Sequence, residues 1–181
     1  MADKSKSKAY STHVSGFWNS SHEFREGDEV LGTLKLRRNL IGIVVSGKYT
    51  PAKGEVLVFR RDPGILGSQF SLWTEHREWL GSALRWSFFA RVVNLSTGSK
   101  ALRMISLSGF RRGWRLMAPK TGELARISAR PFQRNCQINV HRRIDFDQVL
   151  FAYFLGTQLL LQSWWPGPAE QESTAAVPAT S

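Results

Sequence analysis

The sequence predicts a mainly β protein in which a closed barrel of antiparallel strands encloses a hydrophobic helix near the C-terminus. Residues 149–161 are almost entirely apolar, and only Thr157 and Gln158 interrupt them. A helix that is apolar on every face must be buried. The long region before it is rich in β-branched and aromatic residues, with turn residues roughly every eight to twelve positions. Its strands alternate apolar and polar side chains, so the apolar face of the sheet needs closure or cover.

Three predicted β-hairpins share one plan, in which a strand and a polar turn are followed by an acid, an apolar pair and a small residue. They cover residues 22–36, 70–85 and 114–130. Alignment on the acid pairs Glu29 with Glu78 and Glu123. We expect the small residues to lie where strand and helix backbones approach closely, and these are Gly32, Gly81 and Ala125. Further strands are predicted at residues 41–49, 55–61, 88–95, 101–107 and 136–142.

One compact domain is expected, because no linker interrupts residues 16–165. Its central helix is predicted at about residues 146–162. Residues 1–15 are polar and rich in lysine and serine, so we expect a disordered basic tail there. Residues 166–181 combine proline, alanine and polar residues, a composition typical of a second disordered tail.

The predicted helix is shorter than the roughly 20 apolar residues that a bilayer span requires. Trp164 and Trp165 would suit a membrane interface, but a span would leave the apolar face of the sheet uncovered. At the helix start, Asp145 is interpreted as the cap and Asp147 as a favourable charge at the positive helix end. These two carboxylates alone are too few for a calcium shell.

The formal charge of +11 is unevenly distributed along the chain. Residues 80–144 carry 13 Lys and Arg and one acid, a net charge of +12. Residues 1–79 carry a net +3, and residues 145–181 a net −4. Such a concentration of positive charge attracts polyanions, which include anionic lipid headgroups and nucleic acid.

No catalytic or metal-binding motif is recognisable in the sequence, so we expect neither an enzyme nor a cofactor. The four histidines lack ligand spacing, and the single cysteine, Cys136, falls in an apolar alternation typical of a buried thiol in a reducing compartment. Residues 42–48 match P-loop spacing, but Tyr49 replaces the magnesium-binding Ser or Thr, and the segment favours a strand. The N-terminus lacks the apolar core of a secretory signal, so a cytoplasmic protein is expected.

The repeated strand pairs, a last strand and the segment NCQINVHRRIDFDQVLFAYFLGTQLLL resemble the tubby C-terminal-like superfamily. This group includes the tubby domains, the phospholipid scramblases and the LURP-one-related proteins. The resemblance covers roughly residues 17–161 and rests on pattern, without an invariant motif. It implies a closed barrel of about twelve strands around a central hydrophobic C-terminal helix. The run from Arg142 to Asp145 resembles the scramblases and LURP-one-related proteins most.

In this superfamily, tubby domains bind phosphoinositides through basic residues, and scramblases are membrane-associated. The resemblance therefore implies a non-enzymatic domain, peripheral at the membrane, that docks on anionic phospholipid or phosphoinositide headgroups. Paired arginines can fork onto phosphate oxygens. The candidate docking residues are Arg37, Arg38, Arg111, Arg112, Arg115, Arg142 and Arg143, with Arg60 and Arg61 as a further pair.

Residues 109–114 form the strongest of these clusters, because Phe110 and Trp114 could insert at a membrane interface beside the cations. The same charge would also suit nucleic acid, with exposed aromatic residues stacking on bases. A scaffold without a lipid ligand, an enzyme without a visible motif, and arginines that simply keep strand edges apart are the other interpretations. A monomer is expected.

Overall fold

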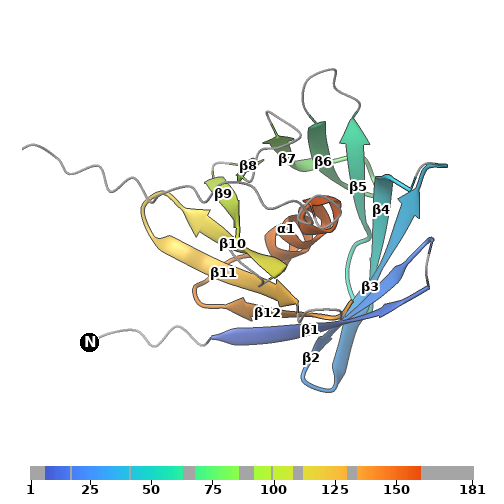
Figure 1. Cartoon of the computed structure of the whole chain (residues 1–181), viewed down its shortest axis with the longest axis horizontal. Coiled ribbons are helices and arrows are strands. Elements are labelled where there is room, and N and C mark those ends of the chain that lie inside the picture. Colours follow the sequence, from blue (N-terminus) through green and yellow to red (C-terminus); the bar gives the residue numbers. More distant parts are fainter. Residues whose placement is uncertain are drawn as a thin grey trace, which may run out of the picture.

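A closed antiparallel barrel of twelve strands surrounds one helix in the part of the chain that the structure describes (Figure 1). The structure is a computed structural model and describes residues 7–16, 18–40, 42–62, 68–85, 92–98, 100–107, 112–129 and 134–159. It confirms the predicted fold class. The predicted tail at residues 166–181 and the last residues of the predicted helix lie outside the described residues.

The strands follow one another around the barrel in chain order, and β1 closes it by pairing with both β2 and β12. Every pairing is antiparallel, so the strands run alternately toward the two ends of the barrel. The elements are β1 (Lys8–Ser15), β2 (Ser21–Glu26), β3 (Glu29–Arg38), β4 (Val44–Pro51), β5 (Leu57–Asp62), β6 (Ser68–Thr74), β7 (Trp79–Arg85), β8 (Val92–Thr97), β9 (Lys100–Ser106), β10 (Arg112–Ala118), β11 (Gly122–Ala129), β12 (Cys136–Val140) and α1 (Phe146–Leu159).

The first strand corrects the prediction of a disordered tail at residues 1–15, because residues 8–15 form β1. Tyr10 and Thr12 of this strand are buried, whereas Ser11 and His13 between them are exposed. Tyr10 pairs with Ile138 of β12, and Thr12 pairs with Phe24 of β2. The polar composition of this segment did not indicate a strand, because few of its inward side chains are apolar. Backbone pairing with β2 and β12 stabilises β1 instead.

The helix lies inside the barrel, with strands on all sides of it (Figure 1). Its side chains from Val149 to Leu155 are all at most 2% exposed. Aromatic rings fix its position along the axis. Phe146 contacts the ring of Tyr10 at a centroid distance of 5.0 Å, and Phe154 contacts that of Phe59 at the same distance. The all-round apolar composition is therefore explained by burial within the protein.

The helix α1 begins directly after Asp145, at the predicted position, but the carboxylate of Asp145 bonds the side chain of Gln148. Asp145 directly precedes the helix, and its carbonyl oxygen accepts hydrogen bonds from the backbone N–H groups of Gln148 and Val149. Its carboxylate accepts from the Gln148 side-chain amide at 3.2 Å and lies 3.4 Å from Lys100 Nζ. Asp147 is in the first turn, as predicted. Within the described residues, no helix is both long and apolar enough to cross a bilayer.

Each predicted hairpin contains a β-bulge at the same place. One unpaired residue precedes the small residue in β3, β7 and β11, and these bulged residues are Leu31, Leu80 and Leu124. The register therefore supports the internal repeat. It also shifts one alignment, because Glu123 corresponds to Val30 and Trp79, one residue away from the positions equivalent to Glu29 and Glu78. Bulges bend and twist their strands, which helps a sheet to close.

The small residues beside these bulges approach neighbouring strands, which corrects the expected contact with the helix. A Cβ on Gly32 would lie 2.6 Å from the carbonyl oxygen of Thr50 in β4. One on Gly81 would lie 2.9 Å from the carbonyl oxygen of Ser96 in β8. The close approaches to α1 occur elsewhere: the site of a Cβ on Gly156 lies 2.9 Å from the Trp114 ring.

Leu155 provides a test of the helix as the barrel core, because its side chain is 1% exposed. We expect Leu155→Ala to lower the free energy of unfolding by about 2–5 kcal/mol, since it leaves a cavity in close-packed surroundings. Leu155→Asp should abolish folding, because it buries an unpaired charge. Urea denaturation followed by circular dichroism measures both, with the exposed Leu40 changed to alanine as the control. Unchanged stability of the Leu155→Asp variant would show that the helix is not the core.

Candidate functional site

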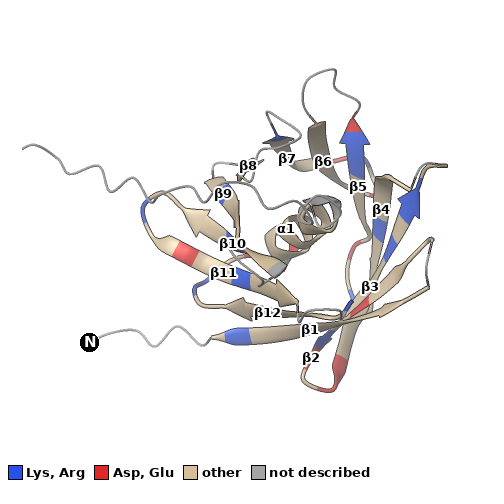
Figure 2. Ribbon diagram, viewed as in Figure 1, with Lys and Arg blue, Asp and Glu red and all other residues tan. Residues whose placement is uncertain are grey.

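The two ends of the barrel differ in charge. The end that holds the β2–β3, β6–β7 and β10–β11 turns and the start of α1 is called here the acidic end. It contains all described acidic residues except Glu23 and Asp62, together with several lysines and arginines. The opposite end is called the arginine end, and Figure 2 shows basic residues where the β3 and β5 arrows reach it. The C-terminal half of α1 points toward the arginine end.

Among the described residues, three arginines at inward-facing strand positions and a fourth, exposed arginine just before β12 define the arginine end. In β3, β5 and β7, buried apolar or small side chains occupy every second position until an arginine takes the last one. A fourth arginine occupies the position that continues the buried alternation of β12 backward. We call this set the arginine mouth, and its members are Arg38, Arg61, Arg85 and Arg134.

One side of the arginine mouth is formed by Arg61 and Arg85. Arg85 is only 6% exposed, and burial followed by repulsion from Arg61 lowers its pKa to about 10. Burial also lowers the pKa of Arg61. The Arg61 guanidinium donates to Ser68 Oγ at 2.9 Å and lies 5.9 Å from the centre of the Phe70 ring. Both groups stay charged at neutral pH, so this side concentrates positive charge in partly dry surroundings.

Arg38 and Arg134 form the other side. Burial lowers the pKa of Arg38, and repulsion from Arg134 lowers it further. Arg38 donates to the Gly42 carbonyl oxygen at 2.9 Å. Among the described residues, no carboxylate forms an ion pair with Arg38, Arg61 or Arg134; the ion pairs seen lie on the barrel wall and at the acidic end. These guanidiniums therefore retain capacity for an external anion.

A buried polar network lies beneath Arg38 and Arg134. His22 Nδ1 is 2.7 Å from the Tyr153 hydroxyl oxygen, and His22 Nε2 is 2.8 Å from Ser20 Oγ. The Tyr153 hydroxyl donates to Thr12 Oγ1 at 3.4 Å. Burial, and then the charges of Arg134 and Arg38, lower the pKa of His22 to about 4. The imidazole is thus neutral at pH 7, and the network links strands β1 and β2 to the central helix.

Two exposed apolar side chains of the described residues flank the arginine mouth. Leu40, at the tip of the β3–β4 connection, is 98% exposed, and Trp18, in the β1–β2 connection, is 47% exposed. Asn39 shapes the first loop, because its side chain accepts from the Ile43 N–H at 2.9 Å. The two loops are adjacent, since a Cβ on Gly42 would lie 3.8 Å from the Trp18 ring. We call Leu40 and Trp18 the apolar rim.

The predicted docking residues do not form a single site. Arg37 and Arg38 lie at the arginine end, whereas Arg142 and Arg143 follow β12 at the acidic end. Arg115 lies on the outer wall, paired across the sheet with Arg126. Arg111 and the side chain of Arg112 lie outside the described residues.

The cluster at residues 109–114 requires a correction. Trp114 is 4% exposed and packs inside the barrel against Gly156, so it cannot insert into a membrane. Its inward position follows from the alternation of β10, in which Leu116 is also buried. Phe110 lies outside the described residues. In the described ranges, the exposed aromatic residue near the arginines is Trp18, in a different connection.

Sequence reasoning missed His22, Arg85 and Arg134 as members of the site. A usable signal was present for the arginines, because in β3, β5 and β7 the inward alternation ends in an arginine where an apolar residue would continue it. Leu34 and Leu36 precede Arg38, and Ala83 precedes Arg85. Arg37 and Arg38 were grouped because they are neighbours in the sequence, although adjacent side chains of a strand occupy opposite faces of the sheet.

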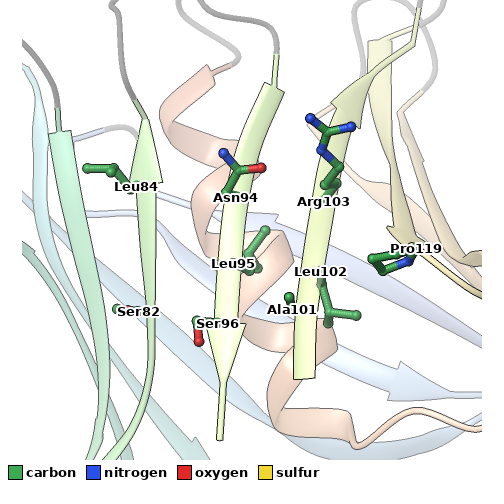
Figure 3. A pocket seen from close by; sticks show the side chains of 9 residues that line it. All are labelled: Ser82, Leu84, Asn94, Leu95, Ser96, Ala101, Leu102, Arg103 and Pro119. Carbon is green, nitrogen blue, oxygen red and sulfur yellow. The ribbon is translucent and has the colours of Figure 1, made fainter. Parts of the chain in front are cut away.

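A groove of about 380 Å³ also crosses the outer face of β7, β8 and β9, and Pro119 borders it (Figure 3). Its described lining includes Asn94, Arg103 and three serine or alanine side chains, but no histidine, cysteine or carboxylate. Within the described part of the chain, no three such side chains are grouped to hold a metal ion. The groove lacks the groups that acid–base chemistry needs, so the arginine mouth is the stronger candidate.

Comparison with protein-family models, with curated proteins and with solved structures finds no match for this chain. The assignment of the candidate site therefore rests on the geometry and charge of this chain.

His22 allows a test of the buried network through pH. The unfolded chain takes up a proton near the ordinary pKa of 6.5, whereas the folded protein does so only near 4. Folded stability should therefore decrease as the pH falls below about 7, and the loss from this group should reach about 2 kcal/mol by pH 5. Urea denaturation of the wild type and of His22→Gln at pH 7 and pH 5 measures this loss. An equally steep pH dependence in both proteins would contradict it.

Proposed function

We propose that the protein is a non-enzymatic binding domain that docks on membranes by holding anionic phospholipid headgroups at the arginine mouth. The observation that carries this proposal is the position of Arg38 and Arg134 beside the apolar rim, at one end of the barrel. The guanidiniums would bind phosphate oxygens, while Leu40 and Trp18 enter the interfacial layer. Cations and apolar side chains on one surface are what peripheral membrane binding requires.

The chemistry of the arginine mouth favours a phosphate group as the ligand. A guanidinium presents several N–H donors in one plane and binds phosphate oxygens in pairs. Repulsion between Arg38 and Arg134 would be relieved by an anion between them. The negative end of the α1 dipole offsets only part of this charge, because it is equivalent to about half an elementary charge.

The apolar rim favours a membrane over nucleic acid. Trp18 could stack on a base, but Leu40 has no equivalent role, and a fully exposed leucine next to cations fits lipid better. Headgroup contacts at the barrel end would also place both loops toward the bilayer. Nucleic-acid binding is therefore an alternative outcome of the experiments below.

We also propose that the chain belongs to the tubby C-terminal-like superfamily. A twelve-stranded antiparallel barrel around an apolar C-terminal helix supports this proposal, because the sequence resemblance implies the same architecture. Membership would agree with a phospholipid or phosphoinositide ligand.

Loss of two guanidiniums that have no carboxylate partner among the described residues tests the docking residues. We expect Arg38→Gln combined with Arg134→Gln to reduce binding to vesicles of phosphatidylserine and phosphatidylcholine at least tenfold, since each charge-assisted hydrogen bond contributes about 1.5–3 kcal/mol. Cosedimentation measures the bound fraction, and vesicles that contain a phosphoinositide show whether that headgroup is preferred.

The matched control is Arg142→Gln with Arg143→Gln, which removes the same charge from the acidic end. Stronger loss in this control than in the mouth variant would move the site to the other end of the barrel. Wild-type binding to single-stranded DNA, but not to vesicles, would favour the nucleic-acid alternative.

Leu40 tests the apolar rim separately. Because its side chain is exposed, Leu40→Asp should leave the free energy of unfolding within about 0.5 kcal/mol of the wild-type value. It should nevertheless weaken vesicle binding, since it removes apolar insertion and adds repulsion from the anionic surface. The same change at Leu84, which lies on the outer wall, provides the control. Equal binding by the wild type and Leu40→Asp would remove the rim from the proposed interface.

A further inference from the structure

We propose that an oxyanion held between Arg38 and Arg134 is bound together with a proton on His22, so that the arginine mouth binds anions more tightly as the pH falls. The ligand class is a tetrahedral oxyanion such as a phosphate group, whether it belongs to a lipid or is free in solution. This inference rests on the proposed function and concerns the regulation of the same site.

The register brings the three side chains together. Val14 of β1 pairs with His22 of β2, and the Val14 N–H donates to the side chain of Asn135 at 3.0 Å. This bond holds the residues before β12 beside the end of β1, so Arg134 and His22 lie on the two sides of Val14. Arg38 reaches the same corner from β3, because the backbone N–H of Leu36, two residues earlier, donates to the Ser20 carbonyl oxygen.

The hydrogen bonds of His22 can accommodate a proton without rearrangement of the backbone. Both ring nitrogens already face hydroxyl oxygens, those of Tyr153 and Ser20. A protonated imidazole donates from both nitrogens, and a hydroxyl oxygen can accept from it. Tyr153 can still donate its own proton to Thr12. The geometry is therefore suitable for both charge states, and electrostatics decides between them.

Within the described part of the chain, no negative charge near His22 could balance a proton. The described titratable or charged groups that face it are Arg38 from β3, Arg134 from the segment before β12 and Tyr153 from α1, and Cys136 of β12 lies next to Tyr153. Burial raises the pKa of both Tyr153 and Cys136, so these two groups are neutral at pH 7. Among the described residues, only the two arginines act on His22 by charge, and both oppose protonation.

A bound anion changes this balance. It cancels the field of the two arginines at His22 and attracts the proton directly, so the pKa of His22 rises. Linkage requires the reciprocal effect: the protonated protein binds the anion more tightly, by a factor of ten for each unit by which the pKa rises. With a bound-state pKa near that of an ordinary histidine, the affinity should increase on the order of tenfold from pH 7 to pH 5.

Inorganic sulfate is the probe for the test, because its charge does not change in this pH range. Two-dimensional NMR of the histidine side chains follows the titration of His22 in the wild-type protein with and without sulfate, and His76 at the acidic end serves as internal control. Calorimetry at pH 7 and pH 5 measures sulfate affinity in the wild type and in His22→Gln. We expect the pKa of His22 to rise with sulfate, and the pH dependence of affinity to disappear in the variant.

The outcomes separate this inference from the proposed function. Sulfate binding of equal strength at both pH values, with an unchanged His22 titration, would overturn the proton coupling, while vesicle binding at pH 7 would still support docking. Proton-coupled sulfate binding without binding to the phosphatidylserine vesicles would support the coupling and overturn the lipid source. Absence of binding to both probes would overturn both proposals. If His22→Gln does not fold, the wild-type NMR titration decides alone.

Discussion

Burial of one apolar helix inside the barrel is the interaction on which the rest of the structure depends. The helix has no polar face, so it is stable only where apolar side chains surround it, and the barrel in turn needs its interior filled. Phe24, Phe59 and Phe70 supply rings from separate strands, and these rings contact Tyr153 and Phe154 of the helix. Helix and sheet therefore stabilise each other.

This arrangement also separates the two ends of the molecule chemically. The helix fills the middle, so polar groups that face inward collect near the ends of the strands. At the acidic end, carboxylates and cations pair with one another, as Lys100 does with Asp145. At the arginine end, the inward alternation finishes in guanidiniums without such pairing for Arg38, Arg61 and Arg134 among the described residues. The proposed anion site is thus a consequence of how the core ends.

The buried network of His22 connects this end to the helix. Tyr153 carries the only hydroxyl in the run of side chains from Val149 to Leu155, and it contacts His22. A polar group placed this deep requires hydrogen-bond partners, and strands β1 and β2 provide them. The same residues fix the helix in rotation and respond to the charge of the mouth, which links core packing to the proposed ligand site.

The sequence by itself determined the barrel, the enclosed helix and most hairpins, because these follow from local alternation, turn residues and an apolar run. It did not reveal β1, whose pairing with β2 and β12 depends on closure and not on its own composition. Nor did it separate Arg38 from Arg142, which are equally basic in sequence but lie at opposite ends of the barrel. Only the tertiary structure decided which cations share a surface, because strand direction and register place each residue at one end and on one face of the barrel. The same two factors bury Trp114 and leave Leu40 exposed.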